Sequence, residues 1–294
     1  MKKVLNFGSM NIDYVYRIPH ILTPGETLGA KEMQVFCGGK GLNQSVAMAR
    51  AGVQVYHAGS VGEEGDDLLA FLENEGVDIR YCRKMEGKSG HTIIQVDDHG
   101  QNCILVFGGA NKRQDHNHIR RVFDAFRPGD FVVLQNEIND PAFLLSEAAE
   151  RGLKIVLNPS PINDELPKLD LSSVDYFVIN EVEGLALTGS EEANTILQVM
   201  RERYPNATVV LTLGERGAYA SVPGETQLYY QKAFEVEVID TTAAGDTFLG
   251  YFVSGVLEGL PIQSCLRQSA LAAAVTVTRS GAAPSIPRKE EVAG

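Results

Sequence analysis

Short runs rich in β-branched and aromatic residues alternate along the chain with longer amphipathic or alanine-rich segments. The short runs are predicted strands, over 4–7, 53–58, 131–135, 154–158, 176–180 and 208–213. Helices are expected between them, for example over 66–75, 141–151 and 193–203. Strands that alternate with helices form βαβ units, so the pattern predicts an α/β fold with a doubly wound, mostly parallel sheet flanked by helices. Ligands of such sheets bind at the carboxyl ends of the strands.

Two segments break this alternation. Residues 14–36 contain strand-like pieces without a helix, and residues 91–107 are predicted to form a β-hairpin around the turn at 97–100. These segments either form a small sheet of their own or extend an edge of the main sheet. No repeat, low-complexity segment or linker divides the chain further, so we expect a single domain over residues 1–294.

Composition narrows the classes of partner. The net charge of -12 argues against nucleic acid and against an anionic membrane, because both require a basic face. The 4 cysteines show no CxxC spacing, which predicts reduced thiols and neither a zinc site nor a disulfide framework. The N-terminus leads straight into a predicted strand, and no run of about 18 apolar residues occurs. We therefore expect a cytoplasmic protein.

The run from Thr241 to Phe248, TTAAGDTF, precedes an apolar, small-residue stretch over 249–260. Small residues let successive backbone amides turn toward one point, and a following helix adds its positive N-terminal end. The segment Ala243-Ala244-Gly245-Asp246 is therefore a candidate anion hole that also carries a carboxylate. The alternative is that Asp246 only caps the helix.

A second motif, FCGGKGLNQ, ends at Gln44 and precedes a predicted helix over 45–51. Its glycines allow a ligand to approach the backbone closely, and Lys40 and Asn43 can bind hydroxyls or anions. Two better-known phosphate-binding motifs do not match this sequence. The segment Gly87-Lys88-Ser89 lacks the first glycine of a P-loop, and the absence of a G-x-G-x-x-G run disfavours a dinucleotide oxidoreductase.

In this order and spacing, the two motifs resemble those of the ribokinase-like (PfkB) family of sugar kinases. The resemblance covers nearly the whole chain, because further segments also match: Gly8–Asp13, Gly109–Asn111, Leu157–Pro161, Asn180–Glu183, Thr212–Gly217 and Thr278–Ser285. It implies a ribokinase-like fold with a small β-sheet lid formed from about 12–37 and 90–108. In the family this lid covers the sugar and often supplies a homodimer contact.

The resemblance implies ATP-dependent phosphorylation of a neutral sugar, with the 5-hydroxyl of D-ribose as the expected acceptor. Asp246 would be the base that takes the hydroxyl proton, while the amides of Ala243, Ala244, Gly245 and Asp246 stabilise the transferring phosphoryl group. The positions that match sugar contacts, in addition to Asp246, are Asn11, Asp13, Gly39, Lys40, Asn43 and Glu137. Kinases for fructose, 2-deoxyribose or adenosine are alternatives within the class. A catalytically idle sugar-binding regulator is the alternative outside it.

The nucleotide and ions are expected at further matching positions. For ATP these are Asn180, Thr212, Leu213, Gly214, Glu215, Arg216, Gly217, Gly245 and Ser269. Ser269 departs from the family pattern, in which many relatives carry an amide that contacts adenine. Asn180 and Glu183 resemble residues that organise Mg²⁺ and its waters, although acidic residues at 181 and 183 would also favour the first turn of a helix. K⁺ or another monovalent cation is implied at Asp240, Thr242, Thr276, Arg279, Gly281 and Ser285.

Overall fold

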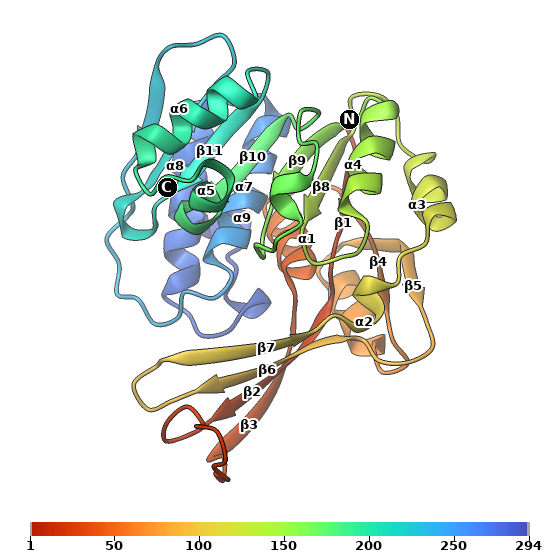
Figure 1. Cartoon of the computed structure of the whole chain (residues 1–294), viewed down its shortest axis with the longest axis vertical. Helices are drawn as coiled ribbons and strands as arrows, with labels where there is room; N and C mark the ends of the chain where they lie inside the picture. Colours follow the sequence, from red (N-terminus) through yellow and green to blue (C-terminus); the bar gives the residue numbers. More distant parts are fainter. Residues whose placement is uncertain (1, 293–294) are drawn as a thin grey trace.

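The computed structural model describes residues 2–292, which form a large sheet between two layers of helices and a small sheet that projects from them (Figure 1). The large sheet has the strand order β13-β12-β11-β10-β9-β8-β1-β4-β5, and antiparallel pairs occur only at the β11-β12-β13 edge. Its strands are β1 Val4–Phe7, β4 Val55–Val61, β5 Asp78–Lys84, β8 Phe131–Gln135, β9 Lys154–Asn158, β10 Tyr176–Asn180, β11 Thr208–Thr212, β12 Ala218–Ser221 and β13 Leu228–Gln231.

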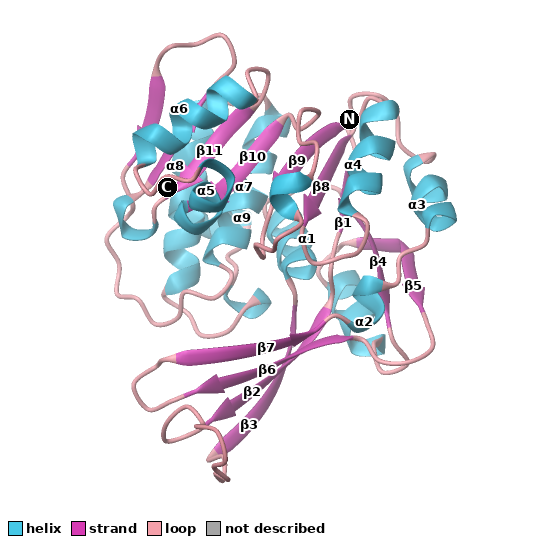
Figure 2. Ribbon diagram, in the orientation of Figure 1, coloured by secondary structure: helices cyan, strands magenta, loops and turns pink. Residues whose placement is uncertain are grey.

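Helices cover both faces of this sheet (Figure 2). One face packs against α3 His116–Phe123, α4 Pro141–Glu150, α5 Glu181–Thr188 and α6 Ala193–Arg203. The other packs against α1 Lys40–Arg50, α2 Asp66–Asn74, α7 Ala244–Glu258 and α8 Ile262–Val277. The short elements are α9 Lys289–Val292 and the 3-10 turns η1 Gly109–Lys112, η2 Leu166–Lys168, η3 Gly214–Arg216 and η4 Ala283–Ser285. The predicted doubly wound α/β fold is confirmed.

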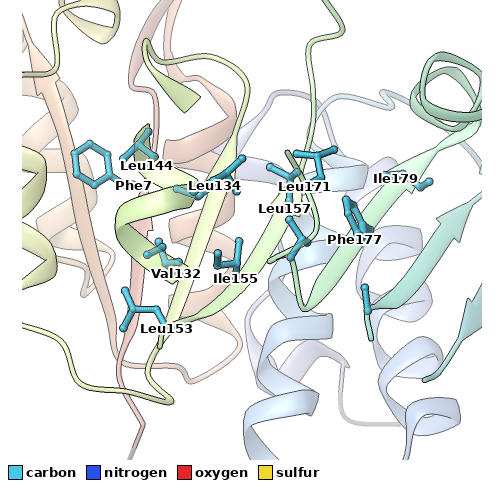
Figure 3. Packing of buried hydrophobic residues seen from close by; sticks show 14 of the residues in the cluster. Phe7, Val132, Leu134, Leu144, Leu153, Ile155, Leu157, Leu171, Phe177 and Ile179 are labelled. Atoms are coloured by element: carbon cyan, nitrogen blue, oxygen red, sulfur yellow. The ribbon is translucent and has the colours of Figure 1, made fainter. Parts of the chain in front are cut away.

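Alternate side chains of the central strands enter two separate hydrophobic cores. Phe7, Leu134 and Phe177 belong to the core beneath α3 to α6, part of which Figure 3 shows. Their neighbours Val133 and Val178 face the core beneath α1, α2, α7 and α8. Burial on both faces explains why these strands are continuous apolar runs rather than alternating ones. Among the described residues, no helix is both long and apolar enough to span a lipid bilayer.

The projecting sheet consists of the segments that broke the sequence pattern. Its strands, in the order β3-β2-β6-β7, are β2 Asn11–Arg17, β3 Glu32–Gly38, β6 Gly90–Val96 and β7 Asn102–Phe107. The large sheet ends at β13 and β5, so these strands do not extend one of its edges. The small-sheet alternative is therefore correct.

Several predicted boundaries differ from those of the structure, and the largest differences concern α1 and β4, which also runs to Val61 instead of ending at 58. β4 begins at Val55 instead of 53, because the backbone amides of Gly52 and Val53 bond to carbonyls of α1. α1 begins at Lys40, before the predicted start at 45, because the carbonyl of Gly39 accepts the Asn43 amide and opens the helix inside the glycine motif. The glycine motif is thus the first turn of a helix and not a separate loop.

Candidate active site

Two glycines bring the start of α1 against the end of β1. Gly39 adopts φ +93°, a left-handed backbone conformation that favours glycine. A β-carbon on Gly41 would lie 2.3 Å from the Ser9 backbone nitrogen, so a larger residue would push α1 away. The Gly41 amide donates to the Ser9 hydroxyl (3.1 Å). This close approach places Lys40 and Asn43 at the carboxyl ends of the central strands.

Asp246 lies in the first turn of α7 and is 7% exposed. Ala243 precedes the helix in a left-handed conformation (φ 62°), which is rare for alanine and costs free energy. The amides of Gly245 and Asp246 occupy the helical positions that have no acceptor within the helix, as an anion site requires. No side chain caps α7, so the capping alternative for Asp246 is not supported.

The Asp246 carboxylate is held by two amides of α1. Asn43 Nδ2 donates to Asp246 Oδ2 (3.1 Å), and Gln44 Nε2 donates to Asp246 Oδ1 (2.9 Å). The Oδ1 atom of Asn43 is buried and has no partner within the described part of the chain. An acceptor oriented in this way can receive a hydrogen bond from a ligand hydroxyl.

A polar cavity of about 210 Å³ joins these groups to neighbouring strand ends. Its polar lining includes Lys40, Asn158, Asn180, Glu183, Thr212 and Asp246. Burial alone would lower the pKa of Lys40, but the carboxylates of Asp246, Glu137 and Glu183 outweigh burial and raise it. A permanently charged ammonium beside a helix N-terminus suits a cavity that receives phosphate.

The predicted sugar positions lie where the small sheet meets α1. Burial raises the pKa of Asp13 to about 6, although Thr92 Oγ1 donates to its Oδ1 (2.6 Å) and favours the ionised form. Asn11 Oδ1 accepts from Asn111 Nδ2 (2.7 Å). Glu137 Oε2 accepts from the Lys40 backbone amide (3.0 Å) and from the Ser9 hydroxyl.

A larger cleft of about 780 Å³ adjoins the polar cavity and shares Thr212, Ala244 and Gly245 with it. Gly214, Glu215 and Gly217 line this cleft, as predicted for nucleotide positions, together with the segment 232–238 and one face of α8. Four predicted nucleotide residues do not line this cleft: Asn180 lines the polar cavity instead, and the other three pack or bond elsewhere. Leu213 is in the hydrophobic core, Arg216 pairs with Glu181, and the buried Ser269 hydroxyl donates to the Cys265 carbonyl (2.7 Å).

Asn180 and Glu183 form a capping box at the start of α5. Asn180 Oδ1 accepts the Glu183 amide (2.9 Å), and Glu183 Oε2 accepts the Asn180 amide (2.9 Å) and Asn158 Nδ2 (3.3 Å). Burial raises the pKa of Glu183, and the nearby Lys40 opposes that rise. Glu183 therefore does have the helix-start role that the sequence offered as an alternative, while its carboxylate also lines the cavity.

No cluster of three histidine, cysteine or acidic side chains that could hold a metal occurs within residues 2–292. Mg²⁺ in phosphoryl-transfer enzymes is usually bound through one or two carboxylates and the phosphates of the substrate, without a dedicated protein cage. Asp246 and Glu183 line one cavity and supply such carboxylates. The donors present thus fit a Mg²⁺ that arrives with a nucleotide.

The residues expected around a monovalent cation are only partly brought together. Asp240 Oδ1 accepts from the Thr242 amide (2.9 Å), and its Oδ2 accepts from the Gly281 amide (2.9 Å), which joins the two loops. The remaining side chains bond locally: Thr276 to Ala272 and Thr247, Ser285 to Ala282, and Arg279 to Glu291. Backbone carbonyls of the two loops would add to the Asp240 carboxylate as oxygen ligands, and such carbonyls leave no signature in the sequence.

The sequence did not single out several polar residues that shape the site. Gln44, Asn158, Asn111 and Thr92 each contact a predicted site residue. Gln44 could have been found, because it lies four residues after Lys40 and therefore on the same face of the helix. Asn158, Asn111 and Thr92 come close to their partners only in the folded chain, so no spacing in the sequence reveals their contacts.

Known proteins match this chain over almost its full length. A model of the pfkB family of carbohydrate kinases matches residues 1–289. The ribokinase of Haemophilus influenzae is 35% identical over 304 residues, covering 99% of this chain and 97% of the relative. A deoxyribokinase of Salmonella typhi is 30% identical, covering 97% and 95%. The structure of Arabidopsis thaliana ribokinase complexed with ribose and ATP superposes with a TM-score of 0.84 at 30% identity, covering 99% and 97%.

Proposed function

The chain belongs to the PfkB family and is an ATP-dependent carbohydrate kinase, and we propose that its acceptor is the 5-hydroxyl of D-ribose, with Asp246 as the catalytic base. The observation that carries this proposal is the buried Asp246 carboxylate at the start of α7. It lines a cavity that also contains Lys40, and it is bonded to Asn43. The proposed base thus shares a cavity with a cation that suits phosphate, and it is bonded to one of the proposed sugar contacts.

In the proposed reaction, Asp246 accepts the proton as the sugar oxygen attacks the γ-phosphorus. The bond from that phosphorus to the bridging oxygen of ADP breaks, and ADP leaves. The amides of Gly245 and Asp246 and the ammonium of Lys40 stabilise the charge on the transferring group. Mg²⁺ bound with the nucleotide would neutralise further phosphate charge, and K⁺ near the loops of Asp240 and Gly281 would support the geometry of the anion hole.

The relatives include both a ribokinase and a deoxyribokinase, so the preferred sugar is the open part of the proposal. Two observations favour ribose. Asn111 donates to the Oδ1 atom of Asn11, which leaves the Asn11 amide nitrogen as the donor for a ligand hydroxyl. Asp13, two residues further along β2 and on the same face of the strand, supplies an acceptor. A donor and an acceptor at positions that match ribose hydroxyl contacts suit a sugar with both the 2- and 3-hydroxyls.

Release of ADP, measured in a coupled assay over a panel of pentoses, hexoses and nucleosides, tests the proposed acceptor. Ribose should give the highest kcat/KM, and 2-deoxyribose should be lower by up to about 10⁴-fold, since a site built to pair a hydroxyl rejects its absence. Equal kcat/KM for the two sugars would remove ribose from first place. Absence of ADP release with every sugar would favour the idle regulator instead.

We also propose that the small sheet forms a homodimer contact. Val35, Ile93 and Leu105 lie in one cross-strand row with Tyr14, and they are 53%, 38% and 66% exposed. An exposed apolar row of this kind is typical of an interaction surface. Light scattering should give the mass of a dimer for the wild type and of a monomer for Leu105→Asp. An unchanged mass in the variant would contradict this contact.

A further inference from the structure

Gln44 lies on α1 at the centre of a largely buried chain of polar side chains that no predicted role explains. The residue is 0% exposed. Its Nε2 donates both to Asp246 Oδ1 (2.9 Å) and to Asn158 Oδ1 (3.1 Å). Its Oε1 accepts from Gln135 Nε2 (2.7 Å). Both donors of the amide and one lone pair of its oxygen are therefore occupied by groups from other elements.

The direction of the Gln44 amide follows from the groups behind it. Asn6 Nδ2 donates to the Gly41 carbonyl (2.7 Å), and a carbonyl can only accept. Asn6 Oδ1 must therefore face Gln135, whose Nε2 donates to it (2.8 Å) and also to Gln44 Oε1. This leaves the Gln44 nitrogen facing Asp246. A reversed Gln44 amide would set two acceptors against each other at Asp246 and two donors against each other at Gln135.

We propose that Gln44 is a positioning residue for phosphoryl transfer: its amide, oriented by Gln135 and Asn6, fixes the plane of the Asp246 carboxylate toward the accepting hydroxyl. This inference rests on the proposed role of Asp246 as base. Asn43 holds the other carboxylate oxygen, so the two neighbouring amides of α1 clamp the group from both sides. The charged groups that face Asp246 are Lys40 from α1 and Glu183 from α5.

A purely structural role for Gln44 would show itself in stability, whereas a positioning role would show itself in turnover. Gln44→Met keeps the length of the side chain and removes its donors. We expect kcat to fall about ten- to hundredfold, the range for one hydrogen bond to a charged group, with little change in KM for sugar and nucleotide. Half-saturation by Mg²⁺ reports on the Asn158 and Glu183 side of the network, and it should change less than kcat does.

Ser254→Ala is the matched control. Ser254, like Gln44, is buried. It lies on α7, and its hydroxyl donates to the Ala51 carbonyl at the end of α1 (3.1 Å), away from the cavity. The control removes a buried α1–α7 hydrogen bond without touching Asp246. It should lower the melting temperature and leave kcat close to the wild-type value.

The decisive test is a double-mutant cycle with Asp246→Asn. If Gln44 acts through Asp246, Gln44→Met should change the small residual kcat of Asp246→Asn by less than about twofold. The same ten- to hundredfold loss in that background would overturn the inference, as would a loss confined to KM or to the Mg²⁺ requirement. Both leave the kinase proposal intact. A wild-type protein that phosphorylates no sugar rejects the proposed function, and the inference with it.

Discussion

The ionised Asp13 carboxylate is expected to lower the stability of the folded protein while it supports sugar binding. The Asp13→Asn variant tests both effects. Burial raises the pKa of Asp13 from 3.8 to about 6. The folded protein therefore holds this proton more tightly than the unfolded chain does. Below about pH 4 Asp13 is protonated in both states and does not lower the free energy of unfolding. The free energy of unfolding falls as the pH rises from about 4, and the loss is complete once the pH has passed about 6.

The size of this effect follows from linkage. A difference of roughly two pKa units corresponds to about 3 kcal/mol of unfolding free energy at pH 7.5, and to about half of that at pH 5. Asparagine does not ionise, and its Oδ1 can still accept from Thr92. Asp13→Asn should therefore be more stable than the wild type by up to about 3 kcal/mol at pH 7.5, with the advantage halved at pH 5.

Urea unfolding of both proteins at the two pH values measures this difference, because titrations shared by both proteins cancel. In the coupled assay the variant should have a KM for sugar that is higher by about ten- to hundredfold, since the acceptor has lost its charge. A stability difference that does not change with pH would refute the reasoning about burial. An unchanged KM would remove Asp13 from the sugar site.

Three further predictions follow. The α8 residues that line the larger cleft, the proposed nucleotide site, are Ala270, Ala273, Ala274 and Val277. Apolar side chains offer the base no hydrogen bond, so GTP should replace ATP with kcat/KM within about 100-fold in the ADP or GDP release assay, and stricter selection would contradict an apolar base site. Amide hydrogen exchange of β2, β3, β6 and β7 should slow when sugar is added, because a lid that closes loses mobility; no change in any of them would count against a lid. Replacing K⁺ by a large organic cation at constant ionic strength should lower kcat, and equal activity would exclude the proposed K⁺ effect.

The central strands could be predicted from sequence almost residue by residue. β1, β8, β9 and β10 have the predicted bounds, because each is a short apolar run that is buried on both faces and ended by a turn. The strands of the small sheet were also anticipated, but their order was not. β2 pairs with β6 across about eighty residues of chain, and such a pairing depends on the tertiary fold and leaves no local pattern.

The candidate site divides in the same way. Asn43 and Asp246 lie in motifs that the sequence displays, and the structure places them within hydrogen-bonding distance. Asn111 and Thr92 contribute through single contacts made by the fold, which no spacing reveals. Ser269 shows the effect of helical phase. Ala270 and Val277 lie on the face of α8 that lines the larger cleft. Ser269 precedes Ala270 by one residue and therefore lies on another face of the helix, where its hydroxyl donates to the Cys265 carbonyl.

Turnover by Asp246→Asn is the most direct measurement of the central claim, that the Asp246 carboxylate takes the proton from the sugar. Asparagine keeps the shape of the side chain and loses the charge, so the melting temperature and the binding of nucleotide and sugar should stay close to wild type. Loss of the base should lower kcat by about 10² to 10⁴. A folded, ligand-binding variant that keeps more than about a tenth of the wild-type kcat would contradict Asp246 as the catalytic base.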